Sequence, residues 1–469
     1  MTTETSPGSA AATAPAPVPQ RLVLVLPSTG EFDSRTYRIA TAAIARGHTV
    51  TVLARWKAGL PEREIDPAGY EIIRIRTDPG QAVPGRMTMR RLFRRLRPVG
   101  TEAVGGSQPG PSTVPSAEET PADGSQAPVG TASASLMRRV ASRIVRRWSI
   151  LLTVRSQTTG ATAVAPKADL IHGMAYMGIP IALAIADEQA PRPKVVYDAR
   201  DIYMDAANLA ETRGLVRAAI ARAERRWARR ADRVITVNQP YADVMAERFG
   251  VSTPLVVMNC AYRYEPNGVR PRRFHERLAL APSQRVVLYQ GGFSRGRGVE
   301  QLFEAITAVD DAVLVLMGYG AEEQVYRDRA DHPSSKGRVH VLPAVPPAEL
   351  LEWVASADVV AMPIQPTTLN HRLTTPNKLF EAMAAGVPVV ASDLPGMASI
   401  VKDSGCGILV DPTDPSAIAR ACREVLAVPP DEAVAWSRRI RAAVHSTYNW
   451  ERQAGVLFSE YGRLTGRPW

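Results

Sequence analysis

Cysteine and aromatic residues are scarce in this chain of 469 residues. The three cysteines, Cys260, Cys406 and Cys422, lie far apart without paired spacing. This pattern excludes a disulfide framework and a cysteine-based zinc site, and it favours a reducing compartment. Because only 6% of the residues are aromatic, the cores must be built from alanine, valine, leucine and isoleucine. With 45% hydrophobic residues and this length, we expect two or three domains.

Long hydrophobic runs are absent as well. No segment approaches the roughly 18 apolar residues that a membrane-spanning helix needs. Residues 1–20 consist mainly of small side chains and prolines. Near the start they carry an acidic residue, whereas a secretory signal peptide carries cationic residues there. They predict a disordered tail, and we expect a cytoplasmic protein.

Positive charge is concentrated in one segment. The chain has a formal net charge of +11, and residues 81–160 alone hold twelve arginines, no lysine and four acids. Within this insertion, 106–135 is rich in Gly, Ser, Pro and Ala and predicts disorder. The flanking stretches 86–97 and 136–152 read as amphipathic helices with arginines on one face, which predicts peripheral binding at the anionic inner face of the plasma membrane. The alternative is that they pack on the neighbouring domain with solvated arginines. No recognised module supports nucleic-acid binding.

Strand and helix patterns alternate in two blocks, which predicts an α/β fold with parallel sheets. We expect two doubly wound, Rossmann-like domains that face a central cleft. The predicted N-terminal domain covers 21–260 with the insertion at about 81–160, and the C-terminal domain covers 261–445. The closing segment, 446–469, is expected to be a separate helix.

A glycine-rich turn follows the strand 285–292. Gly291 and Gly292 precede Arg295 and Arg297, and a helix is expected from about Val299. Glycines allow backbone amides to approach a ligand closely, and a helix N-terminus favours an anion. The turn therefore predicts a phosphate site, with a plain tight turn and solvated arginines as the alternative.

Two more turns follow the next strands of the same block. Gly318 and Gly320 follow the strand from 312, and Pro343 and Val345 follow the strand from 338. Each signal is weak by itself. Because ligands bind beyond the carboxyl ends of the strands in doubly wound sheets, the three turns together predict one site.

The segment 374–393 reads as a packed helix that runs into an apolar strand. Thr375 is expected to cap the helix, Pro376 to occupy its first turn and Gly386 to end it. Lys378 and Glu381 share one face as an i,i+3 pair. One interpretation is a surface ion pair. In the other, the lysine binds a phosphate and the carboxylate accepts hydrogen bonds from sugar hydroxyls.

Several of these stretches resemble a known family. YQGGFSRGRGVEQL, LVLMGYGAEEQ, HVLPAVPPAELLEWVASADVVAMP and above all TPNKLFEAMAAGVPVVASDLPG are similar to segments of the retaining GT-B glycosyltransferases of family 4, group 1. The N-terminal pieces DSRTYRIATAAIARGHTVTVLAR, DLIHG and VVYDARDIY are similar too. The likeness covers roughly 21–80 and 165–465, and it implies that the last helix crosses back onto the N-terminal domain.

The resemblance implies the transfer of a sugar from a UDP- or GDP-linked donor to a glycan or a lipid-linked envelope acceptor, with no cofactor and no metal. The departing diphosphate would itself take the acceptor's proton. The implied catalytic residues are Arg295, Arg297, Lys378 and His172, the last on the cleft wall beside 198–201. The implied nucleotide-binding residues are Glu381 at the ribose, with Gly30, Gly291, Gly292, Gly318, Gly320, Pro343, Val345, Thr375 and Asn377.

Three positions depart from the family pattern. Leu373 stands where the first acid of the paired-acid motif is expected, Gly292 where the phosphate loop has an arginine, and Arg200 where a histidine is frequent. Two other functions stay open: a nucleotide-sugar epimerase on the same fold and, because of Leu373 and Gly292, a degenerate, non-catalytic transferase that serves as a partner subunit.

Overall fold

The computed structural model describes residues 18–31, 33–77, 154–210, 212–266, 268 and 270–469. By its internal contacts the chain divides into two units, Arg76–Ala163 and the remainder. Of the first unit, residues 154–163 are described as helical. The expected tail falls mostly outside the described residues, as do both arginine-rich stretches and the expected disorder of 106–135. Among the residues described, no helix is long and apolar enough to cross a membrane.

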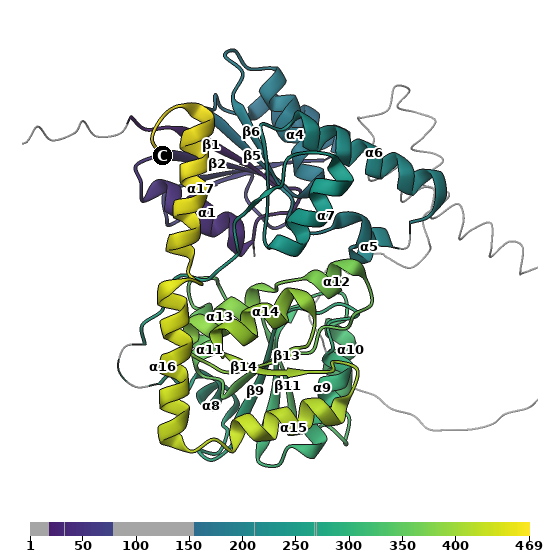
Figure 1. Cartoon of the computed structure of the whole chain (residues 1–469), viewed down its shortest axis with the longest axis vertical. Helices are drawn as coiled ribbons and strands as arrows, with labels where there is room; N and C mark the ends of the chain where they lie inside the picture. The colour runs from purple at the N-terminus through teal and green to yellow at the C-terminus, as the bar shows by residue number, and fades with distance from the viewer. Residues whose placement is uncertain (1–17, 32, 78–153, 211, 267, 269) are drawn as a thin grey trace, which may run out of the picture. The chain divides into compact units, whose positions relative to one another are not determined.

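In the N-terminal half, the described strands form one sheet in the order β3-β4-β2-β1-β5-β6-β7-β8 (Figure 1). All neighbours are parallel except β3 and β4. The strands are β1 (Arg21–Val25), β2 (Thr49–Arg55), β3 (Arg63–Ile65), β4 (Glu71–Ile75), β5 (Leu170–Met174), β6 (Lys194–Asp198), β7 (Arg233–Thr236) and β8 (Leu255–Val256). The direction of winding reverses between β1 and β5.

Helices connect these strands because apolar strands must be covered on both faces. They are α1 (Ser34–Ile44), α4 (Ala175–Asp187), α6 (Gly214–Arg230) and α7 (Gln239–Phe249), with the short η1 (Tyr203–Asp205) and α5 (Ala207–Ala210) before α6. The α1 helix begins where Asp33 accepts a hydrogen bond from the Thr36 amide. This N-cap fixes the direction in which α1 leaves β1.

In the C-terminal half, the described strands form a parallel sheet in the order β11-β10-β9-β12-β13-β14. Its strands are β9 (Arg285–Gly292), β10 (Ala312–Tyr319), β11 (Val339–Pro343), β12 (Val359–Met362), β13 (Val389–Ser392) and β14 (Gly407–Val410). The winding reverses between β9 and β12, the place where doubly wound sheets bind ligands. The prediction of two doubly wound domains is confirmed.

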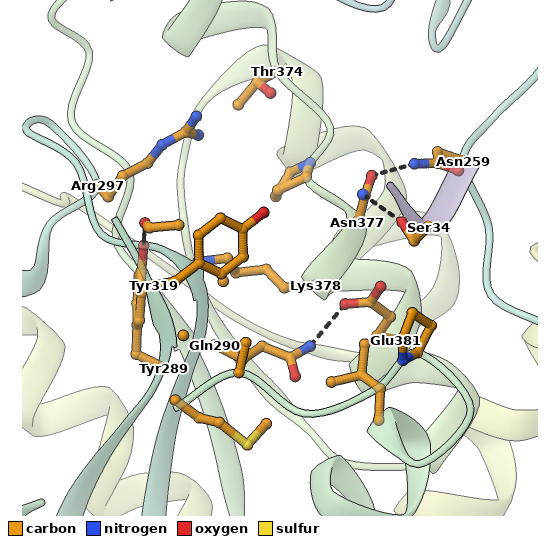
Figure 2. A pocket seen from close by; sticks show the side chains of 18 of the residues that line it. Ser34, Asn259, Tyr289, Gln290, Arg297, Tyr319, Thr374, Asn377, Lys378 and Glu381 are labelled. Carbon is orange, nitrogen blue, oxygen red and sulfur yellow. Dashed lines mark hydrogen bonds between the residues drawn. The ribbon is translucent and has the colours of Figure 1, made fainter. Parts of the chain in front are cut away.

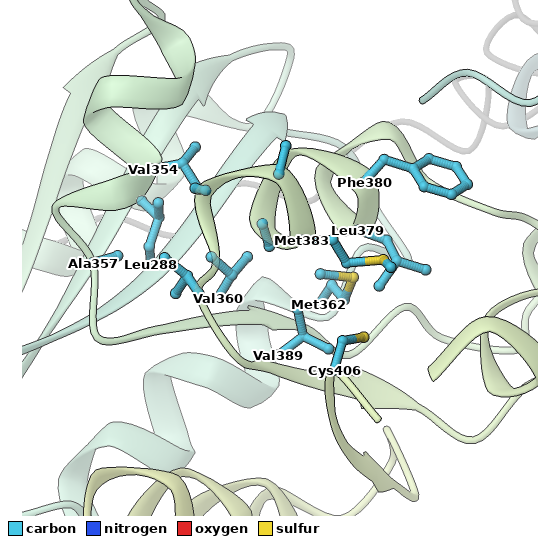
Figure 3. Packing of buried hydrophobic residues seen from close by; sticks show 14 of the residues in the cluster. Leu288, Val354, Ala357, Val360, Met362, Leu379, Phe380, Met383, Val389 and Cys406 are labelled. Carbon is cyan, nitrogen blue, oxygen red and sulfur yellow. The ribbon is translucent and has the colours of Figure 1, made fainter. Parts of the chain in front are cut away.

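The helices of this half are α8 (Arg273–Leu278), α9 (Val299–Ala305), α10 (Glu323–Asp331), α11 (Leu350–Ala355), α12 (Leu369–Leu373), α13 (Asn377–Ala385), α14 (Pro395–Ser404), α15 (Pro415–Leu426) and α16 (Pro430–Ser446), with the short η2 (Ile306–Ala308) after α9. Leu379, Phe380 and Met383 of α13 are buried in one cluster with Leu288 and Val360 of the sheet, and Phe380 points away from these two residues (Figure 3). The apolar face that the sequence predicts for α13 is therefore in the core, and Gly386 ends the helix in the left-handed conformation as expected.

The last helix, α17 (Trp450–Thr465), packs against the N-terminal sheet (Figure 1). Trp450, Leu457 and Phe458 are buried in one cluster with Leu22 and Leu24 of β1. The chain thus leaves the C-terminal half after α16 and closes on the N-terminal half.

Candidate active site

A cavity of about 380 Å³ opens at the carboxyl ends of β9 and β10 (Figure 2). It is lined from the C-terminal half by the ends of these strands, by the segment after β11 and by the start of α13. The N-terminal half adds the start of α1 and the segment after β6. We call it the glycine-turn cavity, after Gly291, Gly292 and Gly318 in its wall. Its size lies within the range of small-molecule sites.

The glycine turn is possible only because side chains are absent there. Gly291 has φ of +112°, a conformation that favours glycine. A Cβ on Gly318 would lie 1.9 Å from the carbonyl oxygen of Gly291, so β9 and β10 approach too closely for any side chain. The turn therefore presents bare backbone to the cavity.

The side chain of Lys378, on α13, extends to the glycine turn and lines the cavity. Its side chain is buried, and its Nζ lies 3.5 Å from the ring centroid of Tyr289. Within the described residues the ammonium group has no hydrogen-bond partner. Burial, reinforced by the nearby charge of Arg297, holds the pKa of Lys378 well below its usual value, and Glu381 opposes this shift. The cavity thus contains a buried amino group without a hydrogen-bond partner, and a bound anion would stabilise its charged form.

Arg297 lines the same cavity, whereas Arg295 does not (Figure 2). The Arg295 side chain is 90% exposed, and its Nε lies 3.6 Å from a carboxylate oxygen of Glu322. Of the two arginines that the sequence singles out, the structure brings only Arg297 to Lys378.

Glu381 is buried and already carries two partners. Arg38 donates a hydrogen bond to its Oε1 at 3.2 Å, and Gln290 donates to its Oε2 at 2.8 Å. Burial raises the pKa of Glu381, while Arg38 and Lys378 oppose the rise. The interpretation of Lys378 and Glu381 as a surface ion pair is wrong, because both side chains are buried and Glu381 pairs with Arg38.

The start of α13 is joined to the N-terminal half by amide contacts (Figure 2). Asn259 donates to Asn377 at 2.6 Å, and Asn377 donates to Ser34 at 3.3 Å. The predicted cap was wrong: Pro376 occupies the N-cap position, and Thr375 precedes it. The Thr375 hydroxyl donates instead to the Gly396 carbonyl at 3.0 Å.

Comparison with known proteins agrees with this architecture. A model of the family described as "Glycosyl transferases group 1" matches residues 284–427. A second, described as "Glycosyl transferase 4-like domain", matches 32–261, so that the two cover most of the chain. The chain belongs to the group 1 glycosyltransferases.

Individual relatives align with only part of the chain. A D-inositol 3-phosphate glycosyltransferase of Xylanimonas cellulosilytica is 30% identical over 202 residues, 41% of this chain and 45% of that protein. An uncharacterized glycosyltransferase of Methanocaldococcus jannaschii is 26% identical over 251 residues, 49% of this chain and 59% of that protein. The chain thus spans about half the length of the curated relatives it matches.

Solved structures share the GT-B fold. The sucrose-phosphate synthase of Thermosynechococcus elongatus aligns with a TM-score of 0.66 and 19% identity, over 95% of this chain and 99% of that one. HepE of Anabaena, solved in complex with UDP and glucose, aligns with a TM-score of 0.61 and 14% identity, over 95% of this chain and all of that one. At these identities the likeness describes the fold.

Some of the other predicted site residues line the glycine-turn cavity, and others lie away from it. His172 does not line the cleft, which corrects the prediction. It is fully buried on the central strand β5, where Nδ1 lies 2.5 Å from the Tyr461 hydroxyl and Nε2 lies 3.0 Å from Asp198. Burial lowers the pKa of His172. The lining of the cavity includes Val345, Thr375 and Asn377 and does not include Gly30, Gly320 or Pro343.

Residues that sequence reasoning missed complete the wall. Gln290 and Asn259 contact the predicted residues directly. Gln290 stands in the quoted stretch YQGGFSRGRGVEQL without being singled out there, and Asn259 stands in none of the quoted stretches. Of the stretch 198–201, Arg200 and Asp201 do line the cavity. Arg200 donates to both carboxylate oxygens of Asp33, at 2.8 and 2.9 Å. In the described ranges, no group of three His, Cys, Asp or Glu side chains could hold a metal ion.

Proposed function

We propose that this protein is a retaining glycosyltransferase that moves a sugar from a UDP- or GDP-linked donor to a glycan or lipid-linked envelope acceptor. The observation that carries the proposal is the Lys378 ammonium group, buried without a hydrogen-bond partner in the described structure and 3.5 Å from the Tyr289 ring centroid. A buried amino group of this kind is stable in its charged form only beside an anion. A diphosphate in the glycine-turn cavity supplies one beside Arg297.

The remaining groups of the cavity suit the other parts of such a donor. A carboxylate offers about four lone-pair sites, and Glu381 uses two of them for Arg38 and Gln290. The others remain for ribose hydroxyls. The names of the relatives, which describe glycosyltransferases, also support the proposal.

Catalysis in this proposal is mainly electrostatic. Lys378, Arg297 and the bare backbone of the glycine turn stabilise the negative charge that grows on the leaving diphosphate. The diphosphate takes the proton of the acceptor hydroxyl on the same face of the sugar, and no metal takes part. Contacts from both halves of the chain hold donor and acceptor in place.

Calorimetry with UDP and GDP, with uridine and guanosine as controls, tests the donor site. We expect Arg297→Gln to weaken diphosphate binding about 10- to 100-fold, the scale of a lost charged hydrogen bond, and to leave nucleoside binding unchanged. Arg295→Gln is the matched control and should bind like the native chain. If the native chain binds no nucleoside diphosphate, the proposal fails and the role of a partner subunit is favoured.

Product analysis separates the remaining alternatives. An epimerase converts a nucleotide sugar without an acceptor, so its product appears when only the donor is present. A retaining transferase forms a glycoside with the anomeric configuration of the donor, which nuclear magnetic resonance measures directly. Co-sedimentation with anionic vesicles tests the proposed peripheral membrane binding. Deletion of 86–155 should abolish it, and binding that survives the deletion contradicts the role of 86–97 and 136–152.

A further inference from the structure

A second cavity, of about 260 Å³, lies in the N-terminal half between η1, α6 and α7. Asp201 lines both this cavity and the glycine-turn cavity. A ligand in the second cavity would therefore lie next to a donor in the first. The volume is just below the usual range for drug-sized ligands, so it suits a single ring.

The inner wall of this cavity is largely apolar. Met204, Met245 and Phe249 are buried side chains that face it, and Tyr203 adds an aromatic ring. The Tyr203 ring is held by the ring of Tyr176, with centroids 5.2 Å apart. Such a surface packs well against the C–H face of a sugar or polyol ring.

One buried acid interrupts the apolar wall. Glu224 of α6 is 3% exposed and lines the cavity. The Tyr197 hydroxyl donates to its Oε1 at 2.7 Å, and in the described residues Oε2 has no hydrogen-bond partner. A carboxyl group placed in this way can bind a hydroxyl of the ligand.

Two arginines stand at the side of the cavity. Arg217 and Arg248 both bind Asp205, at 2.8 and 2.6 Å. Two cations share one carboxylate, so the trio keeps a net positive charge. Both arginines line the cavity and are about one third exposed, which leaves their remaining N–H groups available to a phosphate.

We propose that the second cavity is the acceptor subsite and binds a hydroxyl-rich ring that carries a phosphate. The ring would pack on Tyr203, Met245 and Phe249 while its phosphate meets Arg217 and Arg248. Asp201 then acts as a positioning residue at the boundary of the two cavities. Asn370 donates to its Oδ1 at 3.0 Å, which fixes the carboxylate, and its other oxygen can hold a ring hydroxyl.

This inference rests on the proposed function. In the transfer, an acceptor oxygen forms a bond to C1 of the donor sugar, and the bond from C1 to the diphosphate oxygen breaks. The electron pair stays on the diphosphate, which also takes the acceptor's proton. The acceptor ring can be free or lipid-linked, because the phosphate and the hydroxyl groups are common to both.

A cavity-filling variant tests the subsite without removing any of its contacts. Ala221 of α6 lines the cavity, whereas Ala219 on the same helix is exposed, so Ala221→Leu and Ala219→Leu form a matched pair. The probes are free D-inositol 3-phosphate, free glucose 6-phosphate, and phosphatidylcholine vesicles that contain either phosphatidylinositol or the same fraction of phosphatidylserine, which matches the negative charge. Binding of the probes and of UDP and GDP is measured on the full chain by calorimetry, with vesicle co-sedimentation for the lipid arm.

We expect at least one probe to bind the native chain and Ala221→Leu to weaken it at least tenfold. Ala219→Leu should bind that probe like the native chain, and nucleotide affinity should stay unchanged in both variants. Binding to a free probe identifies a free acceptor, and binding only to the phosphatidylinositol vesicles identifies a lipid-linked one. The proposal is overturned if no probe binds the native chain or if Ala221→Leu binds it normally. If the probes bind in this pattern but no nucleotide binds, the proposed transferase function fails and with it the acceptor role of the cavity.

Discussion

Arg38 of α1 and Glu381 of α13 form a buried ion pair, with Arg38 Nη2 3.2 Å from Glu381 Oε1 and side chains 7% and 6% exposed. Arg38 Nη1 also donates to the backbone and side-chain oxygens of Asn259, at 3.1 and 3.0 Å. The carboxylate proposed to hold the ribose is thus fixed by a residue of the other half of the chain. Binding of the ribose should therefore depend on contact between the two halves.

Removing one partner of this pair should be more costly than removing both. Arg38→Met leaves Glu381 buried without its cation, and Glu381→Gln leaves Arg38 without its anion. We expect each single variant to lose about 3–5 kcal/mol of unfolding free energy, the usual cost of an unpaired buried charge. The double variant should lose clearly less than the sum. Urea denaturation of the four chains measures the coupling, and strictly additive losses would show that the pair is not coupled.

Lys378 should stabilise the complex with a diphosphate and destabilise the free protein. Lys378→Met removes a desolvated amino group that has no hydrogen-bond partner in the described residues, so the free protein should melt at a higher temperature. The same variant should bind UDP or GDP about 10- to 100-fold more weakly, since a charged hydrogen bond is lost. Lys402→Met, at an exposed position of α14, is the control. If Lys378 has a purely structural role, Lys378→Met should lower both the melting temperature of the free protein and its affinity for UDP or GDP. That result would contradict the proposed role.

Nucleotide binding should also take up protons through Lys378. Burial and Arg297 hold the pKa of this lysine well below its usual value in the free protein. A bound diphosphate raises that pKa, so protons are taken up at any pH between the free and the bound values. Calorimetry in two buffers of different ionisation enthalpy should show this uptake in the native chain and not in Lys378→Met. Equal apparent enthalpies in both buffers at every pH below the usual lysine pKa would contradict it.

Gly318 and Gly292 should respond oppositely to alanine. A Cβ on Gly318 meets the Gly291 carbonyl oxygen at 1.9 Å and forces β9 and β10 apart, for which we expect a loss of about 3 kcal/mol or more. At Gly292 nothing lies within 4 Å of the added Cβ, so Gly292→Ala should be neutral or stabilise by about 0.5 kcal/mol. Thermal denaturation compares the two. Equal losses would show that the close approach of the strands does not decide stability.

The sequence predicts local features of this fold well and long-range partners poorly. The strand at 285–292, the helix from Val299 and the glycine end of α13 depend on neighbouring residues, and they lie where expected. The N-cap of α13 does not lie where expected, because the Thr375 hydroxyl donates a hydrogen bond to the carbonyl of Gly396, 21 residues away.

The same limit applies to the candidate site. The sequence predicts that the strand ends form one site, and Gly291, Gly318 and Val345 do line one cavity. The partner of Glu381 is Arg38, 343 residues away, and no pattern in the sequence marks the pair. The position of His172 in the sequence suggests a site residue. In the structure, however, α17 packs near β5, and the Tyr461 hydroxyl contacts the His172 ring.

Glu224 should make stability depend on pH in a specific direction. Burial raises the pKa of this carboxyl group to about 7, although the Tyr197 hydrogen bond and Arg248 oppose the rise. Between the unfolded pKa, about 4.3, and 7, the folded protein binds a proton that the unfolded chain has released, so the contribution of Glu224 to stability falls as pH rises. Arg217 also lines the cavity that Glu224 faces.

Replacing this carboxyl group with an amide isolates its contribution. Glu224→Gln keeps an acceptor for the Tyr197 hydroxyl and cannot ionise. Relative to the native chain, the variant should gain on the order of 3 kcal/mol of unfolding free energy between pH 5 and pH 8. Glu247→Gln, at an exposed position of α7, is the control and should show no such trend. Urea denaturation at a series of pH values measures the difference, and parallel curves for native and Glu224→Gln chains would mean that Glu224 titrates as an ordinary exposed acid.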